Sequence, residues 1–223
     1  MQHRGLVVFY IDRKSYFIVL SVIMKNETLI KAREFSELTK SHGGVFSTSE
    51  LRTLFNTKSD SSFFSVLKSL EEVGTIKKFA RGFYITENFD PLLLCARIIP
   101  QSYISMGTIL SRNGLIGTIA AKEINAIRVG RTRLYSREDL RIKYFGIKET
   151  LFFGFHTVRG IKLADNEKAF IDTISYYLRG HQFVFNPTVD IDLDLLDRRV
   201  LLKYLSQYKN QKFVSYVRSL IDG

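Results

Sequence analysis

The chain of 223 residues is long enough to form one large domain or two modest ones, each with its own core. A formal net charge of +11 and a pI of about 9.7 favour an anionic partner, most commonly nucleic acid; a basic soluble protein without such a partner is the alternative. The single cysteine, Cys95, excludes a disulfide within the chain, and the scattered histidines lack the spacing of a zinc site, so we expect no metal, no cofactor and a cytoplasmic location.

An apolar stretch, YFIVLSVIM (16–24), lies near the N-terminus. It is shorter than the roughly 20 residues that a membrane-spanning helix needs, and no small-residue cleavage site follows it. We therefore expect no membrane partner and interpret residues 1–25 as an N-terminal extension, either an added strand or a poorly ordered tail. Because Met24 begins a natural-looking protein start, a native chain that begins there is the other interpretation.

Two helices are predicted before residue 56. The stretch NETLIKAREFSELTKSHGG (26–44) has apolar residues near one face and ends in two glycines, which is typical of a helix with a glycine stop. Ser47 and Glu50 form an S-x-x-E capping box, which predicts that a second helix begins within STSELRTLF (47–55). After the turn sequence NTKSD, either Ser59 or Asp60 can cap a third helix.

The third helix has two unlike faces. Apolar side chains at helical spacing predict a buried face made of Phe63, Phe64, Leu67, Leu70 and Val73. The opposite face carries small hydroxylated and charged residues, namely Ser61, Ser65, Lys68, Ser69 and Glu72. Small hydroxylated side chains permit a close approach and can donate hydrogen bonds to phosphates or base edges. We predict that this helix contacts DNA through Ser61, Ser62, Ser65, Lys68 and Ser69.

A β-hairpin is predicted directly after the third helix. TIKKFARGFYIT (75–86) alternates with a period of two around Ala80-Arg81-Gly82. Two helices, a short turn, a third helix and a hairpin follow the order of a winged helix-turn-helix, in which the third helix enters the major groove. We predict that Lys77, Lys78 and Arg81 of the wing bind phosphates. A winged helix that binds only other proteins is the alternative.

The composition shifts near ENFDPLLLCARIIPQS (87–102), so we place a domain boundary within 87–100. The predicted fold class is α+β. It consists of an N-terminal winged helix-turn-helix domain at 26–90 and a C-terminal α+β domain at 91–223, in which a small sheet is flanked by helices.

The C-terminal domain is predicted to begin with a helix at SYISMGTILSRNGL (102–115), capped by Ser105 and ended by Gly114. Beyond it the apolar period turns toward two, which predicts a meander of strands with one cationic face. This basic patch comprises Arg128, Arg131, Arg133, Arg141 and Lys143. We interpret it as a second electrostatic contact with DNA, and a solvated sheet face is the alternative.

Three helices are predicted at the end of the chain. The first, ADNEKAFIDTISYYLRG (164–180), is capped by Asp165 or Asn166, and the others lie within 192–208 and 210–221. The buried stripe of the first is predicted to consist of Phe170, Ile171, Ile174, Tyr177 and Leu178.

No group of residues predicts catalysis, so we expect a protein that is not an enzyme. Asp190, Asp192 and Asp194 alternate as paired carboxylates do at Mg²⁺ sites, but no phosphate-binding glycine motif precedes them. Because they directly precede a helix, we interpret them as caps. Glu167 and Asp172 are five residues apart on a helix and point in different directions. A metal-dependent enzyme that uses the three aspartates is the alternative.

Three segments of the chain resemble the AbiEi-type antitoxins of type IV toxin–antitoxin systems, over about residues 28–221. They are the wing GTIKKFARGFY (74–84), the stretch YISMGTILSRNGL (103–115) and the helix ADNEKAFIDTI (164–174), in the family's order and spacing. The chain departs from the family pattern at Asn166, where a proline is frequent. Composition and periodicity by themselves indicate only a basic winged-helix protein with an α+β partner domain.

The resemblance implies a DNA-binding antitoxin that represses its own operon and opposes a nucleotidyltransferase-like toxin encoded beside it. It also implies that the C-terminal domain is needed for neutralisation, with or without a stable toxin complex. Because repressors commonly pair two modules on half-sites about one helical turn apart, we expect a double-stranded operator with an inverted repeat. The alternative is an orphan winged-helix transcription factor whose second domain senses a ligand.

Overall fold

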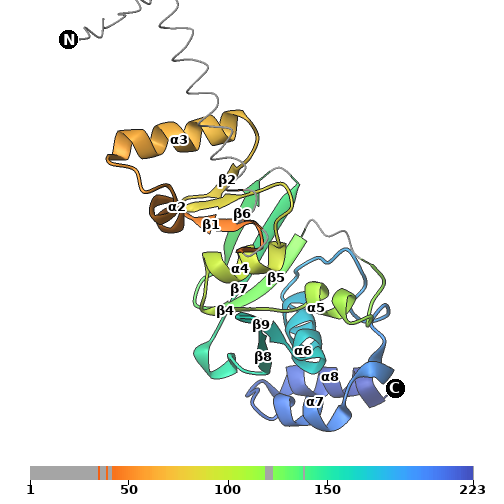
Figure 1. The fold of residues 1–223 in the computed structure, drawn as a ribbon. Coiled ribbons are helices and arrows are strands. Elements are labelled where there is room, and N and C mark those ends of the chain that lie inside the picture. The colour runs from red at the N-terminus through yellow and green to blue at the C-terminus, as the bar shows by residue number, and fades with distance from the viewer. Residues whose placement is uncertain (1–34, 36–38, 40–41, 119–122, 138, 223) are drawn as a thin grey trace, which may run out of the picture. The chain divides into compact units, whose positions relative to one another are not determined.

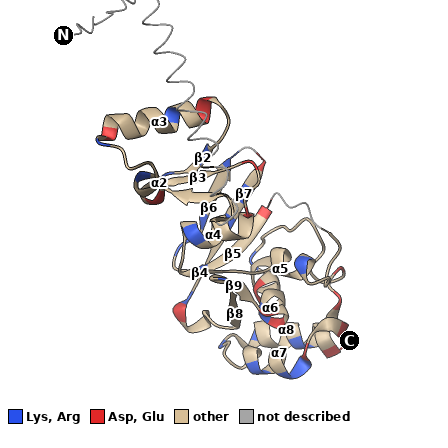
Figure 2. Cartoon of the chain, in the orientation of Figure 1, with Lys and Arg blue, Asp and Glu red and all other residues tan. Residues whose placement is uncertain are grey.

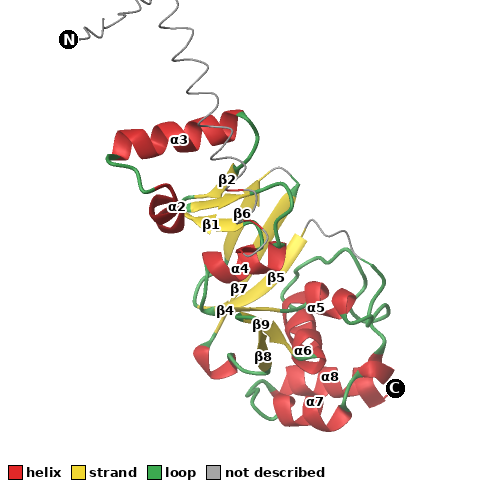
Figure 3. Ribbon diagram, in the orientation of Figure 1, coloured by secondary structure: helices red, strands yellow, loops and turns green. Residues whose placement is uncertain are grey.

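The computed structural model describes residues 35, 39, 42–118, 123–137 and 139–222, and Figures 1 and 3 show its helices and strands. One compact unit ends at Phe89 and a second begins at Asp90, and each is described by itself. The predicted N-terminal extension and most of the helix predicted at 26–44 lie outside the described residues. Both units combine helices with strands, so the fold is α+β, as predicted.

The first unit contains a three-stranded antiparallel sheet and two helices within its described part. Its elements in chain order are β1 (Val45–Ser47), α2 (Thr48–Phe55), α3 (Asp60–Glu72), β2 (Lys77–Ala80) and β3 (Phe83–Ile85). Strands β2 and β3 form the predicted hairpin, and β1 pairs with the other edge of β3. Strand β1 was not predicted, because three residues are too few to show an alternating pattern.

The capping signals place the starts of α2 and α3. Ser47 Oγ accepts the backbone N–H of Glu50 at 3.2 Å, and Glu50 Oε2 accepts the backbone N–H of Ser47 at 2.7 Å. The predicted capping box is therefore confirmed. Ser59 rather than Asp60 caps α3, since Ser59 Oγ accepts the backbone N–H of Ser62 at 3.2 Å.

The core of the first unit combines side chains from both helices and the sheet. Its members are Phe35, Phe46, Leu51, Phe63, Leu67, Leu70, Ile76 and Tyr84. Two residues predicted for the buried face of α3 are exposed instead, Phe64 by 53% and Val73 by 57%. Phe64 is rotated by about 100° from its neighbour Phe63, which takes it off the buried stripe. Val73 follows the last helical residue, Glu72.

The second unit begins with a helix in the region predicted as a domain boundary. This helix, α4 (Pro91–Ile98), is capped by Asp90, whose Oδ1 accepts the backbone N–H groups of Leu92 and Leu93. The elements that follow are β4 (Ser102–Ile104), α5 (Gly107–Arg112), β5 (Glu123–Val129), β6 (Arg133–Arg137), β7 (Leu140–Ile147), η1 (Glu149–Leu151), β8 (Phe155–Val158), β9 (Ile161–Ala164), α6 (Asn166–Tyr177), η2 (Leu193–Leu195), α7 (Arg198–Leu205) and α8 (Gln211–Asp222).

The second unit has one mixed six-stranded sheet in the order β6-β7-β5-β4-β9-β8. The predicted meander is wrong, because β7 lies between β5 and β6 and runs parallel to β5. The single helix predicted at 102–115 is also wrong, because this segment holds β4 and then the short α5. Pairing of β4 with both β5 and β9 outweighs the local helical pattern. Ser105 is therefore not a helix cap; α5 begins after Met106.

Helices α4 and α6 cover opposite faces of this sheet (Figure 1). Tyr144 of β7 donates its hydroxyl to the carbonyl oxygen of Cys95 in α4 at 2.8 Å, whereas Tyr103 of β4 donates to Asp172 in α6 at 3.0 Å. The two tyrosines lie opposite neighbouring residues of β5, Ala126 and Ile127, and neighbouring strand residues point to opposite faces.

The buried stripe of α6 is confirmed in part. Phe170, Ile171 and Ile174 are buried, while Tyr177 and Leu178 are 37% and 47% exposed. Helices α7 and α8 both contact α6. Among the residues that the structure describes, no helix is both long enough and apolar enough to cross a membrane.

Candidate nucleic-acid interface

The hydroxyl-rich face of α3 points away from the core of the first unit. Four of the predicted DNA-binding residues are exposed and the fifth is partly exposed; in sequence order they are Ser61, Ser62, Ser65, Lys68 and Ser69. The acids of α3 lie at its two ends, with Asp60 at the start and Glu71 and Glu72 at the end (Figure 2). Negative charge repels phosphates. The middle of α3, which carries Ser65 and Lys68 and lies between these acidic ends, is therefore the part best suited to DNA.

Arg52, which the sequence analysis did not single out, holds the start of α3. Its Nη1 lies 2.6 Å from Asp60 Oδ1, and its guanidinium carbon lies 4.4 Å from the ring centroid of Phe63 and 5.6 Å from that of Phe64. These contacts join the last turn of α2 to the first turn of α3 and offset the charge of Asp60 beside the serines. Sequence reasoning missed Arg52 because its partner lies across a turn.

The hairpin presents its cations at the surface. Lys77, Lys78 and Arg81 are all exposed, and Gly82 follows in the turn with a φ of +86°, a conformation that favours glycine. The backbone N–H of Lys78 donates to Glu71 Oε1 at 3.2 Å, which attaches the hairpin to the end of α3. The end of α3 and the cationic hairpin are thus linked by a hydrogen bond.

The basic patch predicted in the second unit does not form one face, so that prediction is wrong. Arg128 and Arg133 lie on the sheet face of Tyr144, because Arg133 is opposite Tyr144 and Arg128 is opposite Gly146. Arg141 and Lys143 alternate with Tyr144 along β7 and therefore point to the other face. Arg131 lies between β5 and β6. Alternation within each strand was visible in the sequence, but the register between β5 and β7 was not.

Two of the three alternating aspartates have local structural roles. Asp192 Oδ1 accepts the backbone N–H of Asp194 at 3.1 Å and caps η2, and Asp190 Oδ2 accepts the backbone N–H of Asn186 at 2.6 Å. Within the described part of the chain, no three or more His, Cys, Asp or Glu side chains are grouped so as to hold a metal ion. The capping interpretation therefore describes Asp192 correctly.

Helix α6 contributes to a buried polar cluster that sequence reasoning missed. The side chains of Lys168 and Asp172 are 0% and 1% exposed, and Lys168 Nζ lies 2.6 Å from Asp172 Oδ1. Asp172 Oδ2 accepts hydrogen bonds from Tyr103 at 3.0 Å and Ser105 at 2.8 Å, and Lys168 Nζ donates to Tyr208 at 3.1 Å. Burial, with the Asp172 charge second, raises the pKa of Tyr103 well above its usual value.

Two further acids of the segment ADNEKAFIDTI (164–174) form hydrogen bonds with α7 or with the residue before it. Glu167 Oε1 accepts the backbone N–H of Asp197 at 2.8 Å, and Asp165 Oδ2 accepts the hydroxyl of Tyr204 at 2.6 Å. Burial, followed by this hydrogen bond, raises the pKa of Tyr204. The segment ADNEKAFIDTI therefore joins α6 to α7, β4 and the chain before α8. The signal in the sequence that could have revealed the buried cluster is the i, i+4 spacing of Lys168 and Asp172, which suits an ion pair on a helix.

Comparisons with known proteins show the fold only. No family model matches the chain, and no curated protein matches it. The structure is similar to the crystal structure of the RV2827C protein from Mycobacterium tuberculosis, with a TM-score of 0.55 and 13% sequence identity, over 84% of this chain and 74% of that chain. At such low identity, the similarity describes an arrangement of elements and carries no activity.

Proposed function

We propose that this protein is a DNA-binding antitoxin of the AbiEi type and that residues 26–90 form its winged helix-turn-helix. In that arrangement the first residues of the third helix reach base edges in the major groove. The observation that carries the proposal is the exposed face of α3 with Ser61, Ser62 and Ser65, in the same unit as a hairpin with exposed cations that is attached to the end of α3. Hydroxyls there can bond bases or phosphates, and the wing cations can bind phosphates.

The frame around α3 supports a defined docking geometry. Arg52 links α2 to the start of α3 through Asp60, and Glu71 links the end of α3 to the wing. Groups that read bases need fixed positions, because a good contact requires both the distance and the angle of a hydrogen bond. Lys68 contributes a cation in the middle of the helix, where its ion pair with Glu72 is loose at 3.8 Å and fully at the surface.

The antitoxin part of the proposal rests on the resemblance of three sequence segments. One of them, ADNEKAFIDTI, contains the buried ion pair of Lys168 and Asp172. It also contains Glu167, which accepts a hydrogen bond from the backbone N–H of Asp197 at the start of α7. These contacts explain why the segment carries these residue types, since each of the three side chains binds a partner in another part of the second unit. We propose that this non-enzymatic second unit opposes a nucleotidyltransferase-like toxin and that the whole protein represses its own operon in the cytoplasm.

The proposal is tested by operator binding of the full-length protein to the DNA upstream of its own gene. A Ser65→Glu/Ser69→Glu variant places two charges on the proposed DNA face, and a Ser215→Glu/Ser219→Glu variant places two on exposed positions of α8. We expect specific binding to fall at least tenfold in the first variant, by about 1.4 kcal/mol or more, and to change little in the second. Equal binding by both variants would reject α3 as the DNA-reading helix.

Growth rescue separates an antitoxin from an orphan transcription factor. The neighbouring gene is expressed alone and together with this protein, and growth is scored. Toxicity that this protein relieves supports the antitoxin. If the neighbouring gene is harmless, or if its toxicity persists, the second unit has another role, such as sensing a ligand.

A further inference from the structure

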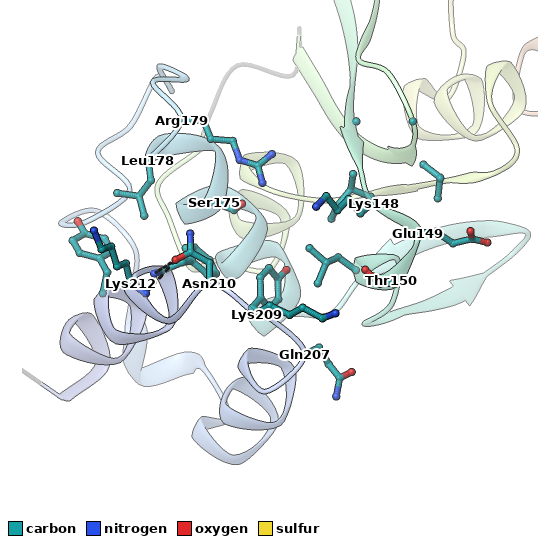
Figure 4. A pocket seen from close by; sticks show the side chains of 18 residues that line it. Lys148, Glu149, Thr150, Ser175, Leu178, Arg179, Gln207, Lys209, Asn210 and Lys212 are labelled. Atoms are coloured by element: carbon teal, nitrogen blue, oxygen red, sulfur yellow. Dashed lines mark hydrogen bonds between the residues drawn. The ribbon is translucent and has the colours of Figure 1, made fainter.

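A cleft of about 1490 Å³ lies within the second unit, outside the proposed DNA contact (Figure 4). Four stretches of chain line it: residues 129–130 at the end of β5, residues 146–151 at the end of β7 and in η1, the end of α6, and the α7–α8 connection with the start of α8. Ligand sites of small molecules commonly occupy about 300–1,000 Å³. This cleft has room for such a ligand together with water.

The charged lining of the cleft is almost entirely cationic. It contains Lys148, Arg179, Lys209 and Lys212 against one acid, Glu149. In the view of Figure 4, the side chains of Lys148 and Arg179 extend toward one another, and the Glu149 carboxylate is directed away from them. None of the four cations forms an ion pair with any residue that the structure describes. A bound anion would relieve the repulsion among these like charges.

Hydrogen bonds and a close backbone contact hold the walls of the cleft. A Cβ on Gly146 would lie 1.9 Å from the carbonyl oxygen of Gly130, so the two backbone segments are in direct contact, and Gly130 N–H donates to the carbonyl of Ile147 at 3.1 Å. Tyr176 donates its hydroxyl to the carbonyl of Gly146. On the opposite side, Tyr208 is tied to the buried Lys168. These contacts hold the walls of the cleft without requiring a ligand.

Apolar side chains adjoin the cations. Leu151, Leu178, Phe213 and Tyr216 all line the same cleft. Surfaces that bind nucleic-acid backbones are polar and strongly positive, whereas small-molecule sites are mostly apolar with a few placed polar groups. A mixed lining of this kind matches a small molecule that has an anionic part and an uncharged part.

We propose that this cleft binds an organic phosphate of nucleotide size. Lys148, Arg179 and Lys209 meet the phosphates, and the uncharged lining, including Leu178 and Tyr216, meets the base or its equivalent. Ammonium and guanidinium groups bind phosphate oxygens through charge-assisted hydrogen bonds. The proposal is independent of DNA binding by α3, since the described residues that line the cleft all belong to the second unit.

The test is calorimetric titration of the full-length protein with each of the four ribonucleoside triphosphates at fixed ionic strength. Lys148→Gln, Arg179→Gln and Lys209→Gln remove exposed cations from the cleft, and Lys203→Gln and Arg218→Gln remove exposed cations of α7 and α8 that do not line it. We expect at least one triphosphate to bind, each cleft variant to weaken its binding about tenfold or more, and the two control variants to stay within about twofold. Circular dichroism and thermal melting check that every variant is folded.

Several results would overturn the proposal. One is that no triphosphate binds, and another is that cleft and control variants lose affinity equally, which would mark general attraction by a basic protein. Binding of inorganic tripolyphosphate as tightly as the triphosphates would remove the role of the uncharged lining. Tighter binding of a single-stranded oligonucleotide, lost in the same cleft variants, would assign the cleft to a nucleic-acid strand. The Ser65→Glu/Ser69→Glu variant separates the two proposals, because it should bind triphosphates normally.

Discussion

The ammonium group of Lys168 lies 2.6 Å from the carboxylate of Asp172, one helical turn away, and both side chains are completely or almost completely buried. Three neutral hydroxyls, those of Tyr103, Ser105 and Tyr208, complete the shell around the pair. A buried charge is tolerable only when it is paired and hydrogen-bonded. This pair therefore joins α6 to β4 and to the chain before α8, and it supports one wall of the basic cleft.

Removal of either partner should destabilise the second unit strongly. We expect Lys168→Met or Asp172→Leu to lower the free energy of unfolding by about 3–5 kcal/mol, because each leaves the other charge buried without a partner. The double variant should lose clearly less than the sum of the single variants. Urea denaturation measures all three, with the exposed Lys203→Met as a control expected to change stability by less than about 0.5 kcal/mol. Additive losses would show that the two charges do not depend on each other.

Cys95 should be unreactive in the folded protein. Burial raises the pKa of its thiol to about 12, and the side chain is fully buried in α4. Because the thiolate is the nucleophile, a thiol reagent at pH 8 should modify the native protein far more slowly than the same protein in denaturant. Mass spectrometry follows the reaction at this single cysteine. Modification of the native protein at the rate of a free thiol would show that α4 opens readily.

The stability of the second unit should depend on His181 between about pH 7 and pH 5. Burial first, and the neighbouring Lys143 second, lower the pKa of His181, whose Nδ1 lies 3.3 Å from Lys143 Nζ; Glu123 acts in the opposite direction. A lowered pKa in the folded state means that the unfolded chain binds a proton first as the pH falls. Stability should therefore be greatest above the ordinary histidine pKa of about 6.5 and should decrease below it.

A His181→Gln variant should flatten that dependence. Thermal melting of both proteins at several pH values above about 5, where few carboxylates titrate, gives the comparison. A variant that loses stability as steeply as the parent would assign the dependence to other groups.

Each wing cation should contribute one phosphate contact. We expect Lys78→Ala and Arg81→Ala to weaken binding to all DNA sequences alike and to reduce the slope of log affinity against log salt by about 1 each. Fluorescence anisotropy with operator and random DNA at several salt concentrations measures both effects. Lys203→Ala and Arg218→Ala remove the same charge from the second unit and should leave the slope nearly unchanged. An unaltered slope in the wing variants would mean that the hairpin does not touch DNA.

Gly146 should not tolerate a side chain. Its Cβ would overlap the carbonyl oxygen of Gly130 at 1.9 Å, so Gly146→Ala should separate β7 from the turn after β5 at a cost of about 1–3 kcal/mol or more. Gly117→Ala is the matched control, since nothing lies within 4 Å of a Cβ there. If Gly146→Ala were as stable as this control in urea denaturation, the close contact between the two backbone segments would be absent in solution.

Much of the local structure follows from signals within a few residues of one another. The pair Ser47 and Glu50 determined where α2 begins, and Arg81-Gly82 determined the turn of the hairpin. These signals were readable because each one involves a hydrogen bond or a backbone conformation that the short segment makes by itself. Helix α6 begins after Asp165, as predicted, although the Asp165 side chain makes no capping hydrogen bond, and Phe170, Ile171 and Ile174 of its predicted stripe are buried while Tyr177 and Leu178 are not.

What the sequence could not determine depends on contacts between distant segments. The parallel register of β5 and β7 alone decided that Arg128 and Lys143 point to opposite faces, because alternation within a strand does not reveal its neighbour. The segment at 102–115 has a helical sequence pattern, but its first residues form strand β4 because they pair with β5 on one edge and with β9 on the other. The cleft likewise joins Lys148 to Lys209, which lie far apart in the chain and meet only because α6, α7 and α8 pack together. By itself the sequence determined a basic α+β protein with capped helices and a cationic hairpin. The tertiary structure decided which charges are buried, which share a surface and which line a cavity, because burial and proximity are properties of the packed chain.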